Sequence, residues 1–299
     1  MPRALLTGAA GFLGGNLLRS LLVRGWEVHA LLGATCREAA LEDVRERITI
    51  HHHDGSTDGM LGLVGKAQPD VVFHLASVFL ADHQPAQIEG LMASNLTFST
   101  QLAEAVVACG GGRLVNTGTS WQYARGEGYL PLNLYAATKQ ACEDILTYYH
   151  DARGLSCITL KLFDTYGTGD PRRKLVSLLL EAARSGGPIA LSPGEQTLDL
   201  LHMDDVAAAF RIAGECLLAA PEPLLASHLL GGTRLTVRAL AECITQVTGC
   251  PIQAQWGGRP YRPREIMVPV SPGPDLPGWA PQVSLEEGLG AAFRALALT

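Results

Sequence analysis

The stretch Gly8-Ala9-Ala10-Gly11-Phe12-Leu13-Gly14 decides the fold of this chain. It follows an apolar run at residues 4–6 and opens a segment, 12–24, whose apolar residues recur with helical spacing. Glycines three residues apart permit a tight turn, and the free amides at a helix start favour phosphate. We therefore predict a strand, a turn and a helix that bind a dinucleotide pyrophosphate. The expected contacts are Gly8, Gly11, Phe12, Leu13 and Gly14.

Strand-like and helix-like segments alternate through the first half of the sequence. Apolar runs predict strands at residues 4–6, 27–31, 48–51, 71–75, 113–117 and 157–162, and amphipathic segments predict helices at 12–24, 91–108 and 135–153. Such alternation produces right-handed crossovers and a parallel sheet with helices on both faces. The sequence therefore predicts an α/β protein with a doubly wound parallel sheet of the Rossmann type.

The pattern changes after Tyr166, where glycine and proline become frequent and the expected helices, 174–184 and 237–248, are short. We assign residues 1–166 to the dinucleotide-binding domain. Residues 167–202 and 221–299 are assigned to a smaller, partly interleaved C-terminal lobe, and 203–220 are expected to pack back onto the first domain. Ligands of an open parallel sheet bind beyond the carboxyl ends of its strands, so the smaller lobe is expected to hold the substrate.

The composition is typical of a globular protein. The chain has 299 residues, of which 47% are hydrophobic and 17% charged, and its formal net charge is -6. This charge disfavours nucleic acid as a partner, and no segment approaches the roughly 20 consecutive apolar residues that span a bilayer. The N-terminus leads directly into a strand, so we expect no signal peptide. We expect a cytoplasmic enzyme with neither a membrane nor a nucleic-acid partner.

Neither the cysteines nor the histidines form a metal-ligand pattern. The 7 cysteines are scattered, and no Cys-x-x-Cys pair occurs, as expected for reduced thiols in a cytoplasmic protein. The run His51-His52-His53 suggests a metal site, but consecutive residues of a strand point to opposite faces of the sheet. We expect no metal.

The end of the second expected strand bears on which dinucleotide binds. An acidic residue there would bind the adenosine ribose hydroxyls and repel a 2′-phosphate. The segment Leu32-Gly33-Ala34-Thr35-Cys36-Arg37 contains no acid before Glu38. Thr35 and Arg37 are suited to hold a phosphate, although Arg37 would equally fit a solvated helix start. NADPH is the preferred cofactor, and NAD is the alternative.

Tyr135-Ala136-Ala137-Thr138-Lys139 places a phenol and an ammonium one turn apart on an expected helix. Free tyrosine has a pKa of about 10, so it needs help to exchange a proton at neutral pH. Lys139 can stabilise the phenolate and reach the nicotinamide ribose. The segment 116–120 follows a strand and carries hydroxyls that could polarise the same carbonyl oxygen. Together with the glycine turn, this pair predicts a nicotinamide-dependent enzyme.

The chain resembles the extended short-chain dehydrogenase/reductase family, in its NAD-dependent epimerase/dehydratase branch. The matching segments are 7–14, His74-Leu75-Ala76, Asn95, 135–139, Phe163-Asp164-Thr165-Tyr166-Gly167, 202–206 and Gly278-Trp279-Ala280-Pro281. The resemblance implies a catalytic set of Thr119, Tyr135 and Lys139, with Thr119 found by counting back from Tyr123. It also implies cofactor contacts from Asp54, near the adenine, and from Leu75, Ala76, Ser77, Asn95, Tyr135 and Lys139.

Several departures from the family pattern narrow the reaction. Ser120-Trp121 stand where the nucleotide-sugar 4,6-dehydratases carry an Asp-Glu pair, which disfavours dehydration. The acid that 4-epimerases typically carry near Gly33 is missing, and Thr119 lies closer to Tyr135 in sequence than is usual in either group. The segments 116–122, 133–140, 164–167 and 192–196 are similar to those of CDP-abequose and CDP-paratose synthases, which reduce the 4-keto group of a nucleotide-linked deoxyhexose.

This resemblance implies NADPH-dependent reduction of an NDP-4-keto-6-deoxyhexose. Tyr135 would donate a proton to the oxygen on C4, Thr119 would hydrogen-bond that oxygen, and Lys139 would support Tyr135 and the ribose. Two alternatives stay open. One is a nucleotide-sugar 4-epimerase with tightly bound NAD, and the other is a non-catalytic cofactor-binding sensor.

A nucleotide-sugar substrate carries a pyrophosphate, which predicts cations in the C-terminal lobe. The candidate cations are Arg172, Lys174, Arg262 and Arg264. The expected remaining substrate contacts are Phe79, Thr119, Ser120, Trp121 and Asp164. In the family, the helices that here carry Cys109 and Cys142 form a two-fold four-helix contact, so a homodimer is expected.

Overall fold

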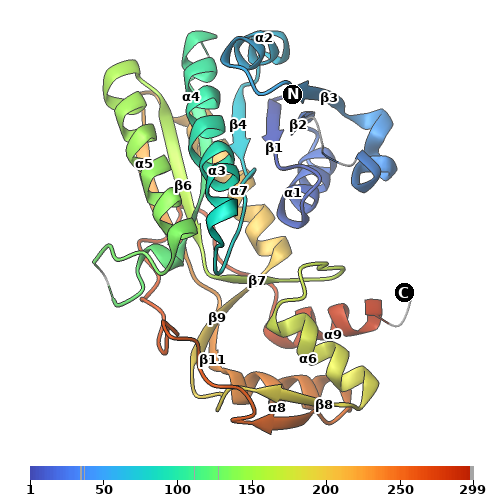
Figure 1. Ribbon diagram of the computed structural model, residues 1–299. Helices are drawn as coiled ribbons and strands as arrows, with labels where there is room; N and C mark the ends of the chain where they lie inside the picture. The colour runs from blue at the N-terminus through green and yellow to red at the C-terminus, as the bar shows by residue number, and fades with distance from the viewer. Residues whose placement is uncertain (34–35, 37, 111, 127, 297–299) are drawn as a thin grey trace.

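The computed structural model describes residues 1–33, 36, 38–110, 112–126 and 128–296, and it divides into a sheet domain and a smaller lobe (Figure 1). The sheet domain is built on seven parallel strands in the order β10-β6-β5-β4-β1-β2-β3. These strands are β1 (Arg3–Thr7), β2 (Glu27–Gly33), β3 (Thr49–His53), β4 (Val71–His74), β5 (Arg113–Thr119), β6 (Ser156–Leu162) and β10 (Leu225–Leu230). The expected doubly wound Rossmann fold is confirmed.

Helices cover both faces of this sheet, as Figure 1 shows. One face carries α1 (Phe12–Val23) and α7 (Met203–Ala219), and the other carries α2 (Thr57–Ala67), α4 (Phe98–Ala108) and α5 (Leu134–Arg153). The first core is filled by residues such as Leu17 and Phe210, and the second by residues such as Leu102 and Leu114. Because both faces are covered, the inner strands β4 and β6 are buried along their whole length.

The smaller lobe has its own core between two short sheets and three helices. One sheet joins β7 (Asp164–Tyr166), β9 (Thr197–His202) and β11 (Thr233–Thr236), and the other joins β8 (Pro188–Leu191) and β12 (Gln253–Trp256). The helices are α6 (Leu175–Ser185), α8 (Val237–Thr248) and α9 (Leu285–Leu296). Leu179, Leu240 and Leu289 are fully buried where these helices meet. The lobe lies below the sheet domain in Figure 1.

The structure differs from the expected boundaries at β10 and α2. The sequence prediction assigned 221–299 to the smaller lobe, but β10 pairs with β6 and forms an edge of the large sheet, so that assignment is wrong for residues 225–230. This edge strand is half-exposed and gives little apolar signal. Helix α2 was not predicted because Gly59, Gly62 and Gly65 dilute its helical pattern. Residues 203–219 form α7, which packs against the large sheet.

Parallel pairing brings the carboxyl ends of the central strands to one edge of the sheet. Thr7 ends β1, His74 ends β4, and Thr119 ends β5. The candidate site residues follow these strand ends, on the side where the smaller lobe begins with β7. None of the helices among the described residues combines the length and the apolar character that crossing a membrane requires.

Candidate active site

The glycine turn between β1 and α1 has no room for a side chain at Gly8 or at Gly14. Gly8 has a φ of +73°, which favours glycine, and its carbonyl accepts a 2.9 Å hydrogen bond from the Gly11 amide. A Cβ at Gly14 would collide with the backbone of Gly8, and a Cβ at Gly8 would lie 2.8 Å from the Ala76 nitrogen. Gly11 is the N-cap residue of α1 and has no side chain with which to cap the helix. The first amides of α1 therefore suit a phosphate, and the turn fits a dinucleotide pyrophosphate.

A buried hydrogen-bond chain holds the loop after β4 against this turn. The Thr7 hydroxyl oxygen accepts from the amides of Leu75 and Ala76, both at 3.0 Å, and lies 2.9 Å from His74 Nδ1. His74 Nε2 lies 2.8 Å from the Ser99 hydroxyl. Burial, helped by the charge of Lys139, lowers the pKa of His74 to about 3. His74 is therefore neutral at physiological pH and serves to position Leu75 and Ala76.

Tyr135 and Lys139 are held in the first turns of α5. Asn133 caps this helix by accepting a 2.9 Å hydrogen bond from the Ala136 amide. Burial raises the pKa of Tyr135, and a hydrogen bond with Ser77 partly opposes that shift. Lys139 is 4% exposed, and burial lowers its pKa. A neutral phenol beside a buried ammonium can donate a proton to a carbonyl oxygen.

Thr119 lies at the end of β5 and begins the short 3₁₀ turn η4 (Ser120–Gln122). Its hydroxyl oxygen accepts a 3.3 Å hydrogen bond from the Trp121 amide, and its own amide donates to Gln122 Oε1 at 3.0 Å. Because backbone amides occupy the acceptor side of the hydroxyl, its proton is left to donate to another group. Thr119 can therefore act as a hydrogen-bond donor to a ligand at the end of β5.

The side chains of Phe79 and Trp121 form an aromatic wall, and Phe79 contacts Tyr135. The ring centroid of Phe79 lies 5.0 Å from that of Tyr135 and 5.4 Å from that of Trp121. Phe79 is 49% exposed, which is high for a large apolar side chain and marks an open face. Lys174 Nζ lies 6.0 Å from the Phe79 ring and 4.0 Å from Asp164 Oδ1. The structure thus brings together four of the residues expected to contact the substrate.

The geometry of the turn and of the Tyr135–Lys139 pair agrees with comparisons to known proteins. Residues 4–222 match the model of the NAD dependent epimerase/dehydratase family. The chain belongs to this family. Its members are NAD(P)-dependent enzymes of the extended short-chain dehydrogenase/reductase type, and this chain is one of them.

Relatives within the epimerase/dehydratase family differ in reaction. The chain is 27% identical to a CDP-abequose synthase of Yersinia pseudotuberculosis over 208 residues, which cover 69% of this chain and 71% of the relative. It is 28% identical to a UDP-glucose 4-epimerase of Mycolicibacterium smegmatis over 311 residues, covering 96% of both chains. In fold it is similar to the UDP-glucose 4-epimerase of Thermus thermophilus solved with NAD, with a TM-score of 0.81, 24% identity and 99% of each chain covered.

Asn95 supports the candidate cofactor site from behind. It is buried within a π-helical turn, η3 (Ala93–Thr97), which interrupts the helix expected at 91–108. Its side-chain amide donates to the Val78 carbonyl at 3.0 Å and to the Thr138 hydroxyl at 2.9 Å, and its Oδ1 accepts from Ser77 Oγ at 3.1 Å. These bonds tie the loop after β4 to α5.

Asp54 was predicted to lie near the adenine of the cofactor. Asp54 follows β3 and accepts hydrogen bonds from the Ser56 amide and hydroxyl, both at 2.8 Å, which lower its pKa. A Cβ at Gly33 would meet none of the described atoms within 4 Å. Thr35 and Arg37, which were predicted to hold a 2′-phosphate, lie outside the described residues.

The predicted cations of the smaller lobe do not form one cluster. Arg172 donates to both carboxylate oxygens of Asp170 at 2.7 Å, and its guanidinium lies 4.6 Å from the centre of the Phe12 ring. Arg264 donates to the Pro131 carbonyl at 2.9 Å. Arg172 therefore lies over the start of α1, and Arg264 is bonded to the loop that contains Pro131. For Arg262, the backbone amide donates to Glu265.

The histidines of β3 separate as expected for a strand. His51 Nε2 lies 2.8 Å from His29 Nδ1, whereas His52 Nε2 lies 2.8 Å from a carboxylate oxygen of Glu38. In the part of the chain that the structure describes, no group of three or more His, Cys, Asp or Glu side chains could hold a metal ion.

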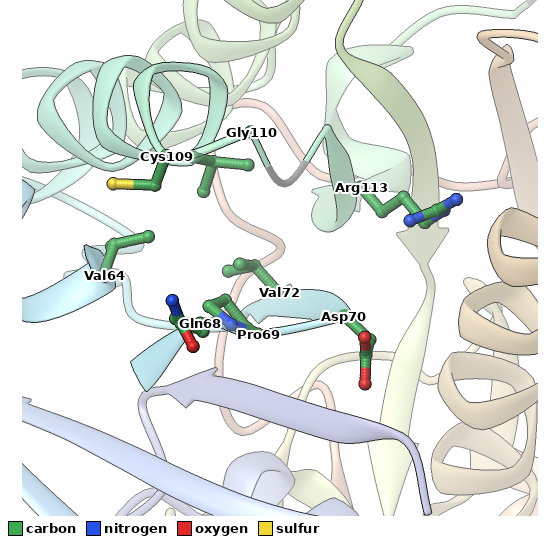
Figure 2. Close-up of a pocket in the computed structure, with 9 residues that line it drawn as sticks. Val64, Gln68, Pro69, Asp70, Val72, Cys109, Gly110 and Arg113 are labelled. Carbon is green, nitrogen blue, oxygen red and sulfur yellow. The ribbon is translucent and has the colours of Figure 1, made fainter. Parts of the chain in front are cut away.

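The cavity in Figure 2 lies away from the candidate active site. It has a volume of about 190 Å³ and is lined by residues that include Asp70, Cys109 and Arg113. Asp70 and Arg113 stand at the amino ends of β4 and β5. The cavity is therefore at the edge of the sheet opposite to Thr7 and Thr119, and it belongs to neither the cofactor turn nor the aromatic wall.

Sequence reasoning missed the polar residues behind Thr119. Gln122, Glu143 and Lys161 are joined by hydrogen bonds and an ion pair in the interior. The available signals were Glu143 one turn after Lys139, and Lys161 between two leucines in the expected strand. Neither signal shows that the two charges meet.

Proposed function

We propose that this enzyme reduces the 4-keto group of a nucleoside-diphosphate-linked 4-keto-6-deoxyhexose. NADPH, held at the glycine turn between β1 and α1, would supply the hydride for C4. Tyr135 donates its phenolic proton to the oxygen on C4, and the Thr119 hydroxyl hydrogen-bonds the same oxygen while negative charge develops. Lys139 stabilises the tyrosinate that is left and holds the ribose of the cofactor. These roles require the neutral phenol, which the raised pKa of Tyr135 favours.

The observation that carries this proposal is the aromatic wall beside Tyr135. The Phe79 ring lies 5.0 Å from the Tyr135 ring, centroid to centroid, and Trp121 packs 5.4 Å from Phe79. This apolar surface suits the methyl group of a 6-deoxyhexose better than a hydroxymethyl group. Trp121 and Ser120 also occupy the positions where dehydratases carry acids, so the chain has no acid–base pair at those positions for elimination. The similarity to CDP-abequose synthases supports the same substrate class.

Lys174 and the arginines are proposed to bind the substrate's pyrophosphate. Lys174 is the best placed of them, since its ammonium lies near Phe79 and is paired only at 4.0 Å with Asp164. Arg172 and Arg264 would join it only if the ligand drew their guanidinium groups from the contacts described above, and Arg262 is proposed as a further contact. We rank Lys174 first for this reason.

The preference for NADPH rests on the absence of an acidic residue between Gly33 and Glu38. We also propose a homodimer through α4 and α5, and a cytoplasmic location consistent with seven free cysteines. Cys109 is exposed at the end of α4, whereas Cys142 is buried against the sheet and lies inside the monomer, so Cys142 takes no part in such a contact.

The test is the absorbance of NADPH, or of NADH in parallel, mixed with the enzyme and a freshly generated NDP-4-keto-6-deoxyhexose. Rapid oxidation, faster with NADPH, is the expected result. Absence of oxidation with CDP-, dTDP- and GDP-linked ketosugars would contradict the proposal.

A second candidate is a nucleotide-sugar 4-epimerase with tightly bound NAD. It is favoured by the epimerase of Mycolicibacterium smegmatis, to which this chain is similar over 96% of both lengths. NAD that survives purification, with interconversion of two sugars and no net use of added cofactor, would identify it. Nucleotide binding with no turnover of any kind would instead indicate a non-catalytic sensor.

A further inference from the structure

A buried glutamine stands directly behind Thr119. Gln122 is fully buried and uses both ends of its side-chain amide. Its Oε1 accepts from the Thr119 backbone amide at 3.0 Å. Its Nε2 donates to Gln140 Oε1 and to Glu143 Oε1, both at 2.8 Å. The orientation of this amide is therefore specified, since a flipped amide would turn its NH2 group toward the Thr119 N–H and its oxygen toward the acceptor oxygens of Gln140 and Glu143.

A buried ion pair between Glu143 and Lys161 holds Gln122 and its partners in place. Glu143 Oε2 lies 2.9 Å from Lys161 Nζ, with side chains 12% and 7% exposed, and Lys161 also donates to the Tyr123 hydroxyl at 2.7 Å. A Cβ at Gly118 would lie 2.6 Å from the Lys161 side chain and 3.1 Å from Glu143 Oε1. The charges are thus enclosed between β5, β6 and α5.

A buried ion pair contributes little net stability, because the loss of hydration offsets the attraction between the charges. The role of this ion pair is to fix the positions of the neighbouring side chains. Glu143 is fixed by Lys161, Gln122 is fixed by Glu143 and Gln140, and the Thr119 amide is fixed by Gln122. The Thr119 hydroxyl also accepts from the backbone of the same turn, in a reciprocal capping box. The side chain of Thr119 is therefore restrained in one orientation, with its proton free for a ligand.

We propose that Gln122 is a positioning residue that fixes the orientation of the Thr119 hydroxyl, with Gln140 and Glu143 acting through it. The inference rests on the proposed function in one respect, which is that Thr119 donates to the oxygen on C4. The orientation itself does not depend on which reaction that oxygen undergoes.

The first experiment measures the orientation of Thr119 without any turnover. Methyl-labelled threonine in the full-length protein lets NMR report the χ1 rotamer of Thr119. We expect one rotamer in the parent protein and rotamer averaging in Gln122→Met, with Gln246→Met, a glutamine on α8 far from Thr119, as the matched control. An unchanged Thr119 rotamer in Gln122→Met would overturn the proposal. If Gln122→Met fails to fold, Gln140→Met removes one of the two acceptors of Gln122 and is expected to give partial averaging.

The second experiment measures rates in whichever reaction the enzyme catalyses. Removing one preorganised donor from an oxyanion site costs about 10²–10³ in kcat, and misplacing it costs less. We expect Gln122→Met to lower kcat by about 10-fold or more, with KM and cofactor affinity within about 2-fold of the parent. In the Thr119→Val background the same change is expected to have no further effect on kcat. Equal losses in both backgrounds would show that Gln122 does not act through Thr119.

The two possible failures are distinguishable. If the enzyme epimerises its substrate and does not reduce it, the proposed function fails while the coupling of Gln122 to Thr119 persists in that reaction. If reduction is observed but the Thr119 rotamer and the coupling are unaffected, the proposed function holds and this inference fails.

Discussion

Lys139 Nζ lies 5.9 Å from the centre of the Tyr135 ring, one turn along α5. Burial acts on the two groups in opposite directions, because it raises the pKa of the phenol and lowers that of the ammonium. Both shifts favour the neutral form. The site therefore holds Tyr135 as a proton donor, while Cys142 and Glu143 partly oppose the lowering of the Lys139 pKa.

Replacement of Tyr135 by Phe removes the proposed proton donor and leaves the ring in place. General acid catalysis typically contributes 10²–10⁴-fold, so we expect kcat to fall by at least about 10²-fold. Binding of NADPH, followed by its fluorescence, is expected to be nearly unchanged. A variant that keeps most of its rate would show that the mechanism is wrong.

Replacement of Gly14 by Ala tests the cofactor turn. The new methyl group would collide with the backbone of Gly8, so the turn must open and the affinity for the dinucleotide is expected to fall at least about 10-fold. Gly15→Ala is the matched control, because its Cβ would meet the flexible end of the Arg19 side chain at 3.0 Å. Equal affinities of the two variants, measured by titration with NADPH, would argue against a pyrophosphate site at this turn.

Replacement of Lys174 by Met tests the proposed pyrophosphate contact. A hydrogen bond to a charged group contributes about 1.5–3 kcal/mol, so the KM for the nucleotide sugar is expected to rise about 10-fold or more. Cofactor affinity is expected to stay the same. Arg173→Met is the control, since Arg173 is exposed and its ion pair with Glu181 spans 3.6 Å. A KM that changes equally in both variants would point to a general effect of charge.

Acid lability is expected from His74. Its pKa in the folded protein, about 3, lies below the ordinary value of 6.5, so the unfolded chain takes up a proton first as the pH falls. The stabilisation from neutral His74 is complete above pH 6.5 and is lost as the pH falls toward 3. Between pH 7 and pH 5 the loss is about 2 kcal/mol, at 1.36 kcal/mol per pH unit below 6.5.

Urea unfolding of the parent and of His74→Gln at both pH values measures this loss. The variant is expected to be less stable at pH 7 but to lose less stability on acidification. The same change at the exposed His52 controls for removal of a histidine. A parallel loss in the parent and in His74→Gln would show that another group is responsible.

Local spacing was enough to predict the fold class and the central pair of the site. The glycine turn, the strands and helices of the first half, and the one-turn spacing of Tyr135 and Lys139 depend on residues that are neighbours in sequence. Backbone sterics and helical periodicity act over that range, so these features could be deduced before the fold was known. Edge strand β10 was missed because a half-exposed strand has no strong pattern of its own.

Tertiary structure alone decided which partners the polar residues have. Arg172 was predicted to contact the substrate; its ion pair with Asp170 is local, but only folding places its guanidinium over the distant Phe12 ring. Gln122, Glu143 and Lys161 come from a turn, a helix and a strand, and their contacts exist only once β5, β6 and α5 have packed. Hydrogen bonds and ion pairs act over a few ångströms between groups far apart in the chain, and no sequence spacing encodes that distance.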